Sequence, residues 1–149
     1  MATENLRNSA SADPQDAILV DLDGTLALRN ERSPFDWHRV SEDSANVPII
    51  DVIQALADKG LVIIVVSGRD EVCRGDSTDW LARYLQRPFI LLMRRCGDNR
   101  RDEEVKREMW DEHIHPHFNI TIAFDDRSRC VDLWRSLGVT TLQVADGDF

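Results

Sequence analysis

The sequence predicts an α/β fold, in which a doubly wound parallel sheet lies between two layers of helices. Short apolar runs alternate along the chain with helical stretches of about ten residues, as expected for right-handed βαβ units. The run 61–66 is continuously apolar and rich in Val and Ile, which is typical of a strand buried on both faces of a parallel sheet. With 149 residues, of which 42% are hydrophobic, the chain can form one domain with its own core, and we place that domain at 16–149.

The first part of the chain divides into a tail, a strand and a flap. Residues 1–15 are polar and show no periodicity, so we expect a flexible tail. The apolar run 17–20 predicts the first strand. Residues 27–47 have no clean helical or strand period, and we expect them to form a small ordered flap over the loop that follows this strand.

The later elements follow from caps, stops and apolar spacing. Proline suits the first turn of a helix, glycine ends one, and Ser or Thr caps its beginning. The predicted elements are a helix from Pro48 to a stop at Lys59-Gly60, the strand 61–66, a helix capped by Ser77 or Thr78 through Gln86, a strand at 88–92, a helix from Arg101 to about Glu112, a strand at 120–124, a helix from its cap Ser128 to Leu137, and a last strand at 139–144.

Charge and cysteine content narrow the class of protein. The 27 acidic residues exceed the 18 Lys and Arg and give a net charge of −9, which disfavours tight non-specific binding to nucleic acid, so any such contact must be local. The three cysteines lack metal-ligand spacing and are interpreted as reduced thiols. No apolar run approaches the ~20 residues of a membrane span and no signal-peptide pattern begins the chain, so we expect a soluble cytoplasmic protein without a membrane partner.

Two aspartates follow the first strand directly and indicate catalysis. Asp21 and Asp23 lie two residues apart, and unpaired buried carboxylates are costly unless a metal or another partner compensates them. An aspartate can attack phosphorus directly, so Asp21 is the candidate nucleophile. Asp23 can protonate the leaving alkoxide and later deprotonate water. The alternative for this pair alone is a capped turn with two solvated acids.

Three further pieces lie downstream, and a parallel sheet brings the two that follow strands to the same edge as Asp21. Ser67 follows the strand 61–66, and its hydroxyl with nearby backbone N–H groups can bind phosphate oxygens, although Ser-Gly after a strand is usually only a turn. Lys106 can neutralise a phosphoryl group, or it can be a solvated partner of an acid on its own helix. Asp125 and Asp126 follow the strand 120–124, where Mg²⁺ can take carboxylate ligands and offset their repulsion.

Together these four motifs resemble the haloacid dehalogenase superfamily of aspartate-nucleophile phosphatases. The resemblance implies a Rossmann-like core, and the short flap implies that there is no large cap domain. It also implies that the nucleophile, the acid-base residue, and the phosphate ligands Ser67 and Lys106 act together. The metal, Mg²⁺, would be bound by Asp21, by Asp23 through its main-chain carbonyl, and by Asp125 and Asp126.

A closer similarity runs from residue 17 to the C-terminus. The chain resembles the 3′-phosphatase half of phage polynucleotide kinase-phosphatase in its motifs Asp21 to Ala27, Val65 to Arg69, Gly97 to Asp102 and Gly147 to Phe149. The resemblance implies that the flap arginine, the arginine after Ser-Gly and the aspartate before the lysine matter for catalysis, since arginine forks suit nucleotide phosphates. The alternative for each arginine is an ion pair with a nearby acid. The implied substrate-binding residues are Thr25, Arg32, Gly68, Arg69, Arg100 and Asp102.

The function predicted from these residues is a Mg²⁺-dependent phosphomonoesterase that removes 3′-terminal phosphate from a polynucleotide through an aspartyl-phosphate. One alternative is a phosphatase of nucleotides or sugar phosphates, which the acidic charge favours. Another is a non-catalytic subunit that binds ends or a kinase chain. The sequence contains no Gly-x-x-x-x-Gly-Lys-Ser/Thr motif, so we expect no 5′-kinase activity by that route and consider a separate 5′-kinase or ligase chain as a partner.

Aromatic and histidine residues outside these motifs have two interpretations. Trp37 lies in the flap and is a candidate substrate contact, because aromatic rings can stack on bases. The other tryptophans, Trp80, Trp110 and Trp134, fall in predicted helices and are expected in the core. His113, His115 and His117 alternate in a way that does not suit one helical face, and are interpreted as packing or surface residues rather than as a metal site.

Overall fold

The structure, a computed structural model, describes residues 13–149 and has a five-stranded parallel sheet at its centre. The strand order is β5-β4-β1-β6-β7, so the chain begins in the middle strand and fills one side of it before the other. This order is that of a doubly wound fold and confirms the predicted fold class. The strands are β1 (Gln15–Asp21), β4 (Val62–Asp70), β5 (Phe89–Arg94), β6 (Phe118–Asp125) and β7 (Thr141–Gln143).

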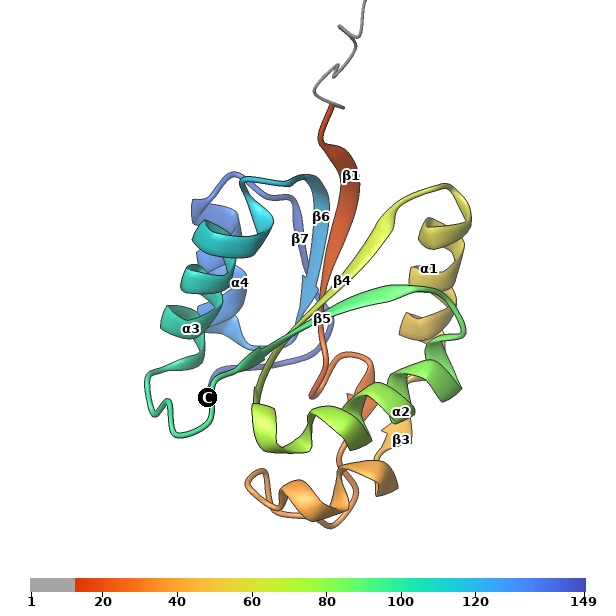
Figure 1. The fold of residues 1–149 in the computed structure, drawn as a ribbon, viewed down its shortest axis with the longest axis vertical. Helices are drawn as coiled ribbons and strands as arrows, with labels where there is room; N and C mark the ends of the chain where they lie inside the picture. Colours follow the sequence, from red (N-terminus) through yellow and green to blue (C-terminus); the bar gives the residue numbers. More distant parts are fainter. Residues whose placement is uncertain (1–12) are drawn as a thin grey trace, which may run out of the picture.

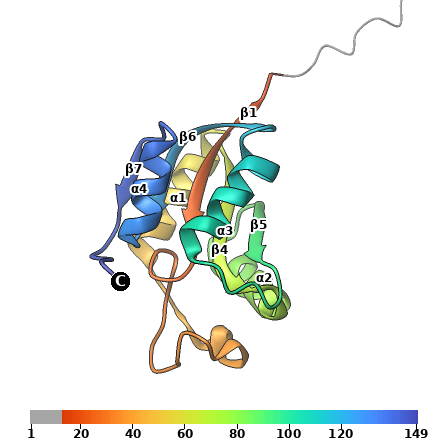
Figure 2. The ribbon, with the colours of Figure 1, turned by 90° about the vertical axis from the view of Figure 1, so that its left-hand side faces the viewer.

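Helices cover both faces of the sheet and complete three layers. Figure 1 shows the sheet between the helices of its two faces, and Figure 2 views the molecule from the side of α3 and α4. One face carries α1 (Val47–Asp58) and α2 (Arg74–Leu85), and the other carries α3 (Asp102–Met109) and α4 (Ser128–Ser136).

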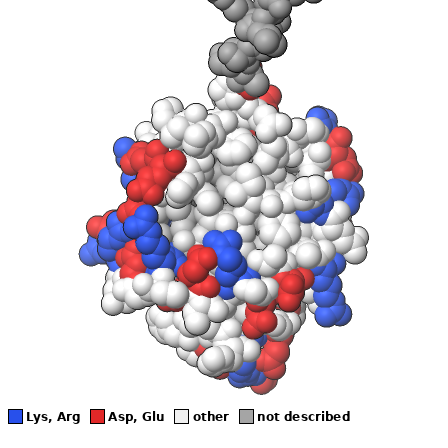
Figure 3. Space-filling model, in the orientation of Figure 1, with Lys and Arg blue, Asp and Glu red and all other residues white. Residues whose placement is uncertain are grey.

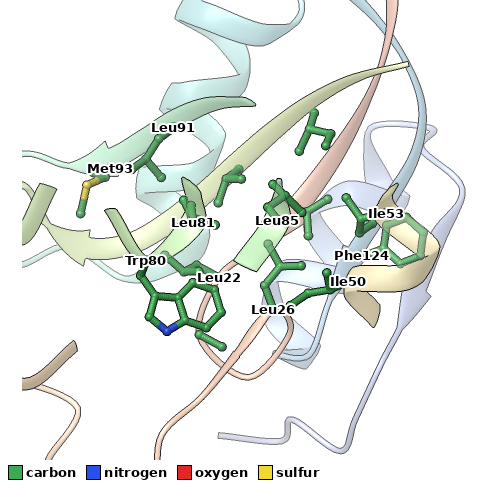
Figure 4. Packing of buried hydrophobic residues seen from close by; sticks show 14 of the residues in the cluster. Leu22, Leu26, Ile50, Ile53, Trp80, Leu81, Leu85, Leu91, Met93 and Phe124 are labelled. Atoms are coloured by element: carbon green, nitrogen blue, oxygen red, sulfur yellow. The ribbon is translucent and has the colours of Figure 1, made fainter. Parts of the chain in front are cut away.

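The sheet splits the hydrophobic core into two clusters because side chains alternate between its faces. Ile18 and Val20 of β1 pack toward α1 and α2, whereas Ala17 and Leu19 pack toward α3 and α4. Figure 4 shows the first cluster, where Leu81 and Leu85 lie among side chains from the sheet and from α1. Burial on both faces explains the unbroken apolar runs in the sequence of the central strands.

The flap is a short hairpin with a 3₁₀ turn rather than a further domain. Strands β2 (Ala27–Leu28) and β3 (Ser44–Ala45) pair antiparallel, and the 3₁₀ turn Trp37–Glu42 lies between them. Within residues 13–149 no cap domain is inserted between the elements of the core, in agreement with the prediction of a small flap and no large cap. Figure 2 shows the flap below the carboxyl end of β1.

The element boundaries depart from the sequence prediction at two helix starts. Helix α2 begins at Arg74 and not after Ser77 or Thr78, because the Asp70 side chain accepts a 2.8 Å hydrogen bond from the Val72 N–H and starts a 3₁₀ turn that leads into the helix. Ser128 is the first helical residue rather than the cap of α4, and its N–H donates to the carbonyl of Gly147 instead, at 2.8 Å.

The ends of the chain's later elements also differ. Helix α3 ends at Met109 and continues as one π-helical turn, Trp110–Ile114, and the last strand is three residues long. His115 stacks on Trp110, with ring centroids 5.7 Å apart, which supports a packing role. Of the predicted N-terminal tail, residues 1–12 lie outside the described residues, and the first strand begins at Gln15.

The face of the molecule in Figure 3 has no broad basic patch. Figure 3 shows acidic and basic side chains interspersed around the margins of one face, while uncharged atoms cover most of its centre. Among the described residues, no helix is long and apolar enough to cross a membrane.

Candidate active site

The carboxyl ends of β1 and β6 bring together the side chains that the sequence analysis placed at one edge of the sheet. Asp21 is the last residue of β1 and Asp125 is the last residue of β6, and these strands are neighbours. The Lys106 Nζ from α3 donates to Asp21 Oδ1 at 2.8 Å and to Asp125 Oδ2 at 2.9 Å. All three side chains are buried, so the lysine holds two strand ends together in a low-dielectric place.

A cluster of three buried carboxylates surrounds this lysine. Oxygens of Asp21, Asp125 and Asp126 lie within 4.8 Å of one another. Burial raises the pKa of Asp21 well above its ordinary value, and the charge of Asp125 adds to the increase. Burial likewise raises the pKa of Asp126. One ammonium against three carboxylates leaves two negative charges without compensation, so the donor set fits a hard divalent cation with oxygen ligands.

Lys106 stays charged in this environment. Burial alone would lower the pKa of its ammonium, but the charges of Asp125 and Asp21 outweigh burial and raise the pKa well above its ordinary value. A buried lysine fixed between two carboxylates is a point charge aimed at the place where a phosphoryl group would meet Asp21. The alternative of a solvated lysine on the surface of α3 is therefore wrong.

Several close contacts fix the Asp125-Asp126 turn. Asp125 Oδ2 also accepts from the indole N–H of Trp134 at 3.2 Å. The Gln143 side-chain amide donates to the Asp126 carbonyl at 3.0 Å, and Gly147 passes so near that an added Cβ would lie 1.7 Å from this same carbonyl oxygen. The metal-binding candidates thus depend on the last strand and on the segment after it, for which the sequence analysis gave a family resemblance at Gly147 to Phe149 but no structural role.

The turn that follows β1, residues 22–25, packs on Asp126. Gly24 adopts a φ of +81°, and a Cβ there would lie 2.2 Å from Asp126 Oδ2, so only glycine fits this turn. The Thr25 hydroxyl is 3.5 Å from Asp21 Oδ2 and 3.4 Å from Asp126 Oδ1. Thr25 is fully buried between the two acids, and its hydroxyl helps to fix the positions of both carboxylates in this structure.

The second aspartate of the motif belongs to a separate ion network. Arg69 donates from Nη2 to Asp23 Oδ1 at 2.8 Å, and Arg32 donates from Nη2 to the same oxygen at 3.2 Å. Both guanidinium groups are buried, whereas the Asp23 side chain is 33% exposed and faces the pocket. The two arginines therefore contact Asp23 from the protein interior.

Asp43 completes this network and was missed by the sequence analysis. It is 3% exposed and accepts from Arg32 Nε at 2.7 Å and from Arg69 Nη2 at 2.8 Å. Nothing in the local pattern distinguishes it from the other acids of the polar flap. What marks Asp43 is a long-range ion pair, because the flap brings it to Arg69 on β4, which lies 26 residues away in the chain.

A second group of arginines lies at this edge of the sheet: Arg94 at the end of β5, Arg100 in the loop before α3, and Arg127 after β6. Arg94, which the sequence analysis also missed, donates to the Gly68 carbonyl at 2.8 Å and pairs with Asp102. Arg127 pairs with Asp102 as well, at 2.7 Å. A Cβ on Gly68 would lie 2.6 Å from Asp102 Oδ1, so this glycine permits the close approach of α3 to β4. Arg100 pairs with Asp98 and Glu108.

These groups surround one pocket of about 540 Å³ at the carboxyl edge of the sheet. Its lining includes Asp21, Asp23, Lys106 and both metal-binding candidates of β6, so the sequence-predicted centre is brought together. Arg32, Ser67 and Thr25 are buried behind the lining. Ser67 lies within β4, which continues to Asp70 instead of ending at residue 66 as predicted, and its Oγ accepts from the Arg69 N–H at 3.1 Å.

The fold and the carboxylate-lysine centre define a phosphatase of the haloacid dehalogenase type. Residues 15–149 match the family model described as “Polynucleotide kinase PNKP phosphatase domain”, and the chain belongs to that family. The resemblance drawn from the motifs is thereby confirmed.

Known relatives agree with this assignment. A protein of Autographa californica nuclear polyhedrosis virus, assigned as a bifunctional polynucleotide kinase/RNA ligase, is 33% identical over 129 residues. A chain in the structure of the Pnkp1/Rnl/Hen1 RNA repair complex shares 34% identity with a TM-score of 0.88, over 93% of this chain. This chain spans 19% of the viral protein and 45% of the repair-complex chain. The Class C acid phosphatase from Bacillus anthracis with tungstate bound shares the fold, with a TM-score of 0.61 and 20% identity over 80% of this chain and 55% of that one.

Proposed function

We propose that this chain is a Mg²⁺-dependent polynucleotide 3′-phosphatase that prepares nucleic-acid ends for repair. The observation that carries the proposal is the buried Lys106 bridge between Asp21 and Asp125 at the base of a pocket whose other walls hold arginines. Membership of the family of polynucleotide kinase phosphatase domains supports the choice of a polynucleotide end as substrate.

In the first half of the reaction, an Asp21 oxygen attacks phosphorus. The bond between that oxygen and phosphorus forms as the bond from phosphorus to the 3′-oxygen breaks, which leaves an aspartyl-phosphate. Lys106 orients the attacking carboxylate and offsets charge that develops on the phosphoryl oxygens. Its second bond, to Asp125, keeps the ammonium from moving with the substrate.

Asp23 transfers the proton in both halves of the reaction. It donates a proton to the leaving 3′-oxygen, and it then takes a proton from the water that attacks the aspartyl-phosphate, which regenerates the Asp21 carboxylate and releases phosphate. Arg32 and Arg69 fix the direction of the Asp23 carboxylate from the protein side. The exposed third of that side chain faces the pocket, where the leaving oxygen would lie.

The carboxylates of Asp21, Asp125 and Asp126 would hold the magnesium ion, which the donor set fits by charge and by ligand type. When bound, the ion supplies positive charge that draws the phosphoryl oxygens toward the nucleophile and offsets the repulsion between substrate and carboxylates.

The alternative is a phosphatase of small metabolites. The flap leaves the pocket open to solvent, since the described chain has no domain that could close over it, and an open pocket suits a chain end better than a metabolite that must be enclosed. The viral relative's assignment as a polynucleotide kinase/RNA ligase, and the RNA repair complex of the structural relative, support RNA ends and a kinase or ligase partner for this chain as well.

The test measures phosphate release from matched 3′-phosphate and 5′-phosphate oligonucleotides of RNA and DNA and from a 3′-mononucleotide, with and without Mg²⁺. We expect metal-dependent release that favours the 3′-phosphate oligonucleotide and is lost in Asp21→Asn. The matched control is Asp51→Asn, an exposed acid of α1, which we expect to leave the rate unchanged. Turnover of the mononucleotide alone would assign the chain to metabolite hydrolysis, and an active Asp21→Asn variant would exclude the aspartyl-phosphate.

A further inference from the structure

The flap side of the pocket carries apolar side chains that the reaction at Asp21 does not use. Phe35 is 80% exposed and Leu28 is 40% exposed, and both line the pocket together with Trp37. A large exposed apolar group costs free energy in water, and such groups usually mark a binding surface where they gather on a concave site. This group of side chains, called here the flap wall, faces the same cavity as the catalytic carboxylates.

The flap wall is fixed in place before any ligand arrives. The Phe35 and Trp37 rings meet edge to face, with centroids 6.4 Å apart and an interplanar angle of 88°. Trp37 is half-buried and packs against the core cluster between the sheet and α1 and α2. Trp37 therefore anchors the exposed Phe35 ring to the core, and one face of that ring is left for a planar ligand at little ordering cost.

Arg29 is the second unusual feature of this wall. The other cationic side chains of the lining each have a carboxylate partner: Arg69 with Asp23, Arg94 and Arg127 with Asp102, Arg100 with Asp98, and Lys106 with Asp21. Arg29 is exposed and makes no ion pair with any residue of the described range 13–149. It is thus available to an anion that arrives from solvent.

We propose that the flap wall is a nucleotide-binding subsite, in which Phe35 stacks on the base of the terminal nucleotide and Arg29 contacts the phosphodiester on its 5′ side. The proposal rests on the proposed function and refines it. It makes the substrate an end of at least two nucleotides, because the phosphodiester that Arg29 contacts joins the terminal nucleotide to its 5′ neighbour. Trp37 acts in it as the support of Phe35, not as the stacking ring.

The stacking step is tested with a mutant cycle in which either the ring or the base is removed. The substrates are a 3′-phosphate oligonucleotide with a normal terminal base and the same oligonucleotide with an abasic 3′ end. We expect Phe35→Ala to raise the KM for the first about tenfold, a usual effect for loss of one stacked base, and to leave the KM for the abasic end unchanged. Phe35→Tyr retains the ring and should restore the wild-type KM.

The phosphodiester contact is tested with substrates that differ by one nucleotide. A dinucleotide 3′-phosphate has the internucleotide phosphate and a 3′-mononucleotide lacks it. We expect Arg29→Gln to raise the KM for the dinucleotide about fivefold, to leave the mononucleotide unchanged, and to reduce the slope of log KM against log salt by about 0.7. The matched control is Arg39→Gln, a flap arginine that is paired with Glu42 outside this pocket and should change neither KM.

The outcomes separate this proposal from the function on which it rests. If the wild-type chain releases no phosphate, or if Asp21→Asn does not abolish the release, the proposed function is overturned. Wild-type release with equal KM values for Phe35→Ala, Arg29→Gln and the parent chain would overturn the subsite alone. That second result, combined with a loss of binding to a purified kinase or ligase chain in Phe35→Ala, would assign the flap wall to protein docking instead. Thermal unfolding of each variant verifies that the fold is retained.

Discussion

Replacing Asp43 by asparagine removes one charge from the centre of the network behind Asp23 at almost constant volume. Its carboxylate accepts three hydrogen bonds from two buried guanidinium groups: from Arg32 Nε at 2.7 Å, from Arg32 Nη2 at 2.9 Å and from Arg69 Nη2 at 2.8 Å. An asparagine offers one acceptor oxygen and points an NH₂ group toward one of the arginines. The two guanidinium groups then share a single carboxylate, that of Asp23.

The expected magnitude follows from the burial of these groups. Removing one partner of a buried ion pair typically costs about 3–5 kcal/mol, and we expect the lower part of this range because Asp23 retains contact with both arginines. For a domain of this length a loss of about 3 kcal/mol lowers the Tm by roughly 10 °C. Without the Asp43 charge the two arginines are held less firmly, and so is the Asp23 carboxylate that they orient, so the proton-transfer step should slow by at least about tenfold.

The assay combines thermal unfolding with kcat on two substrates that differ in their need for an acid. A nucleotide 3′-oxygen is a poor leaving group and requires the proton from Asp23, whereas p-nitrophenolate leaves without it. Asp43→Asn should therefore reduce kcat more on a 3′-phosphate oligonucleotide than on p-nitrophenyl phosphate. The control is Glu42→Gln, an exposed neighbour. A Tm within about 2 °C of the parent chain, or equal losses on both substrates, would refute the positioning role of Asp43.

Two further variants address the centre and its support. Lys106→Met should abolish turnover while it keeps the apolar stem, and it should bind Mg²⁺ more tightly, because loss of the ammonium leaves Asp21 and Asp125 without their shared cation; turnover assays and titration calorimetry measure both effects. Gly147→Ala should lower the Tm and weaken Mg²⁺ binding about tenfold or more, because the added methyl would displace the carbonyl of Asp126; thermal unfolding and the same titration measure these effects.

The controls for these variants come from positions with open space. Gly75 lies in α2 with no atom near an added Cβ, so Gly75→Ala should stabilise the chain slightly, as alanine does in a helix. Weaker Mg²⁺ binding in Lys106→Met would contradict the charge argument at the centre. An unchanged affinity in Gly147→Ala would show that the Asp126 turn does not depend on the segment that follows β7.

The sequence predicts the part of the site that the backbone pattern determines. Asp21 and Asp125 follow from apolar strands whose carboxyl ends must meet at one edge, and the parallel sheet brings them together as expected. Lys106 lies on a helix, and its place at this centre followed from the family resemblance instead. Asp43 and Arg94 could not be found in this way, because each looks like an ordinary polar residue of a loop or strand end. Their partners lie at distant positions that only the packed chain brings near.

The predictions for Arg32 and Arg69 are limited in the same way, because their contact partners also lie at positions that only the packed chain brings near. Sequence similarity places Arg32 and Arg69 beside the reaction, but it carries no information on which carboxylates each guanidinium meets. In the structure both are buried and contact Asp23 and Asp43, so their effect on catalysis is predicted to pass through Asp23. Their predicted direct binding of substrate stays a prediction, and the comparison of leaving groups described for Asp43→Asn applies to them as well.

The charges of the pocket explain how a chain with a net charge of −9 can accept a polyanion. The lining contains seven aspartates against six cationic side chains, and nearly all of these cations are paired, so the pocket has an excess of one negative charge. A divalent cation at the carboxylate cluster would change this excess to one positive charge. Metal binding would then control substrate entry as well as chemistry. Removal of the metal should therefore weaken the binding of a 3′-phosphate oligonucleotide more than the binding of the same oligonucleotide with a 3′-hydroxyl end, which an equilibrium binding measurement with and without Mg²⁺ checks.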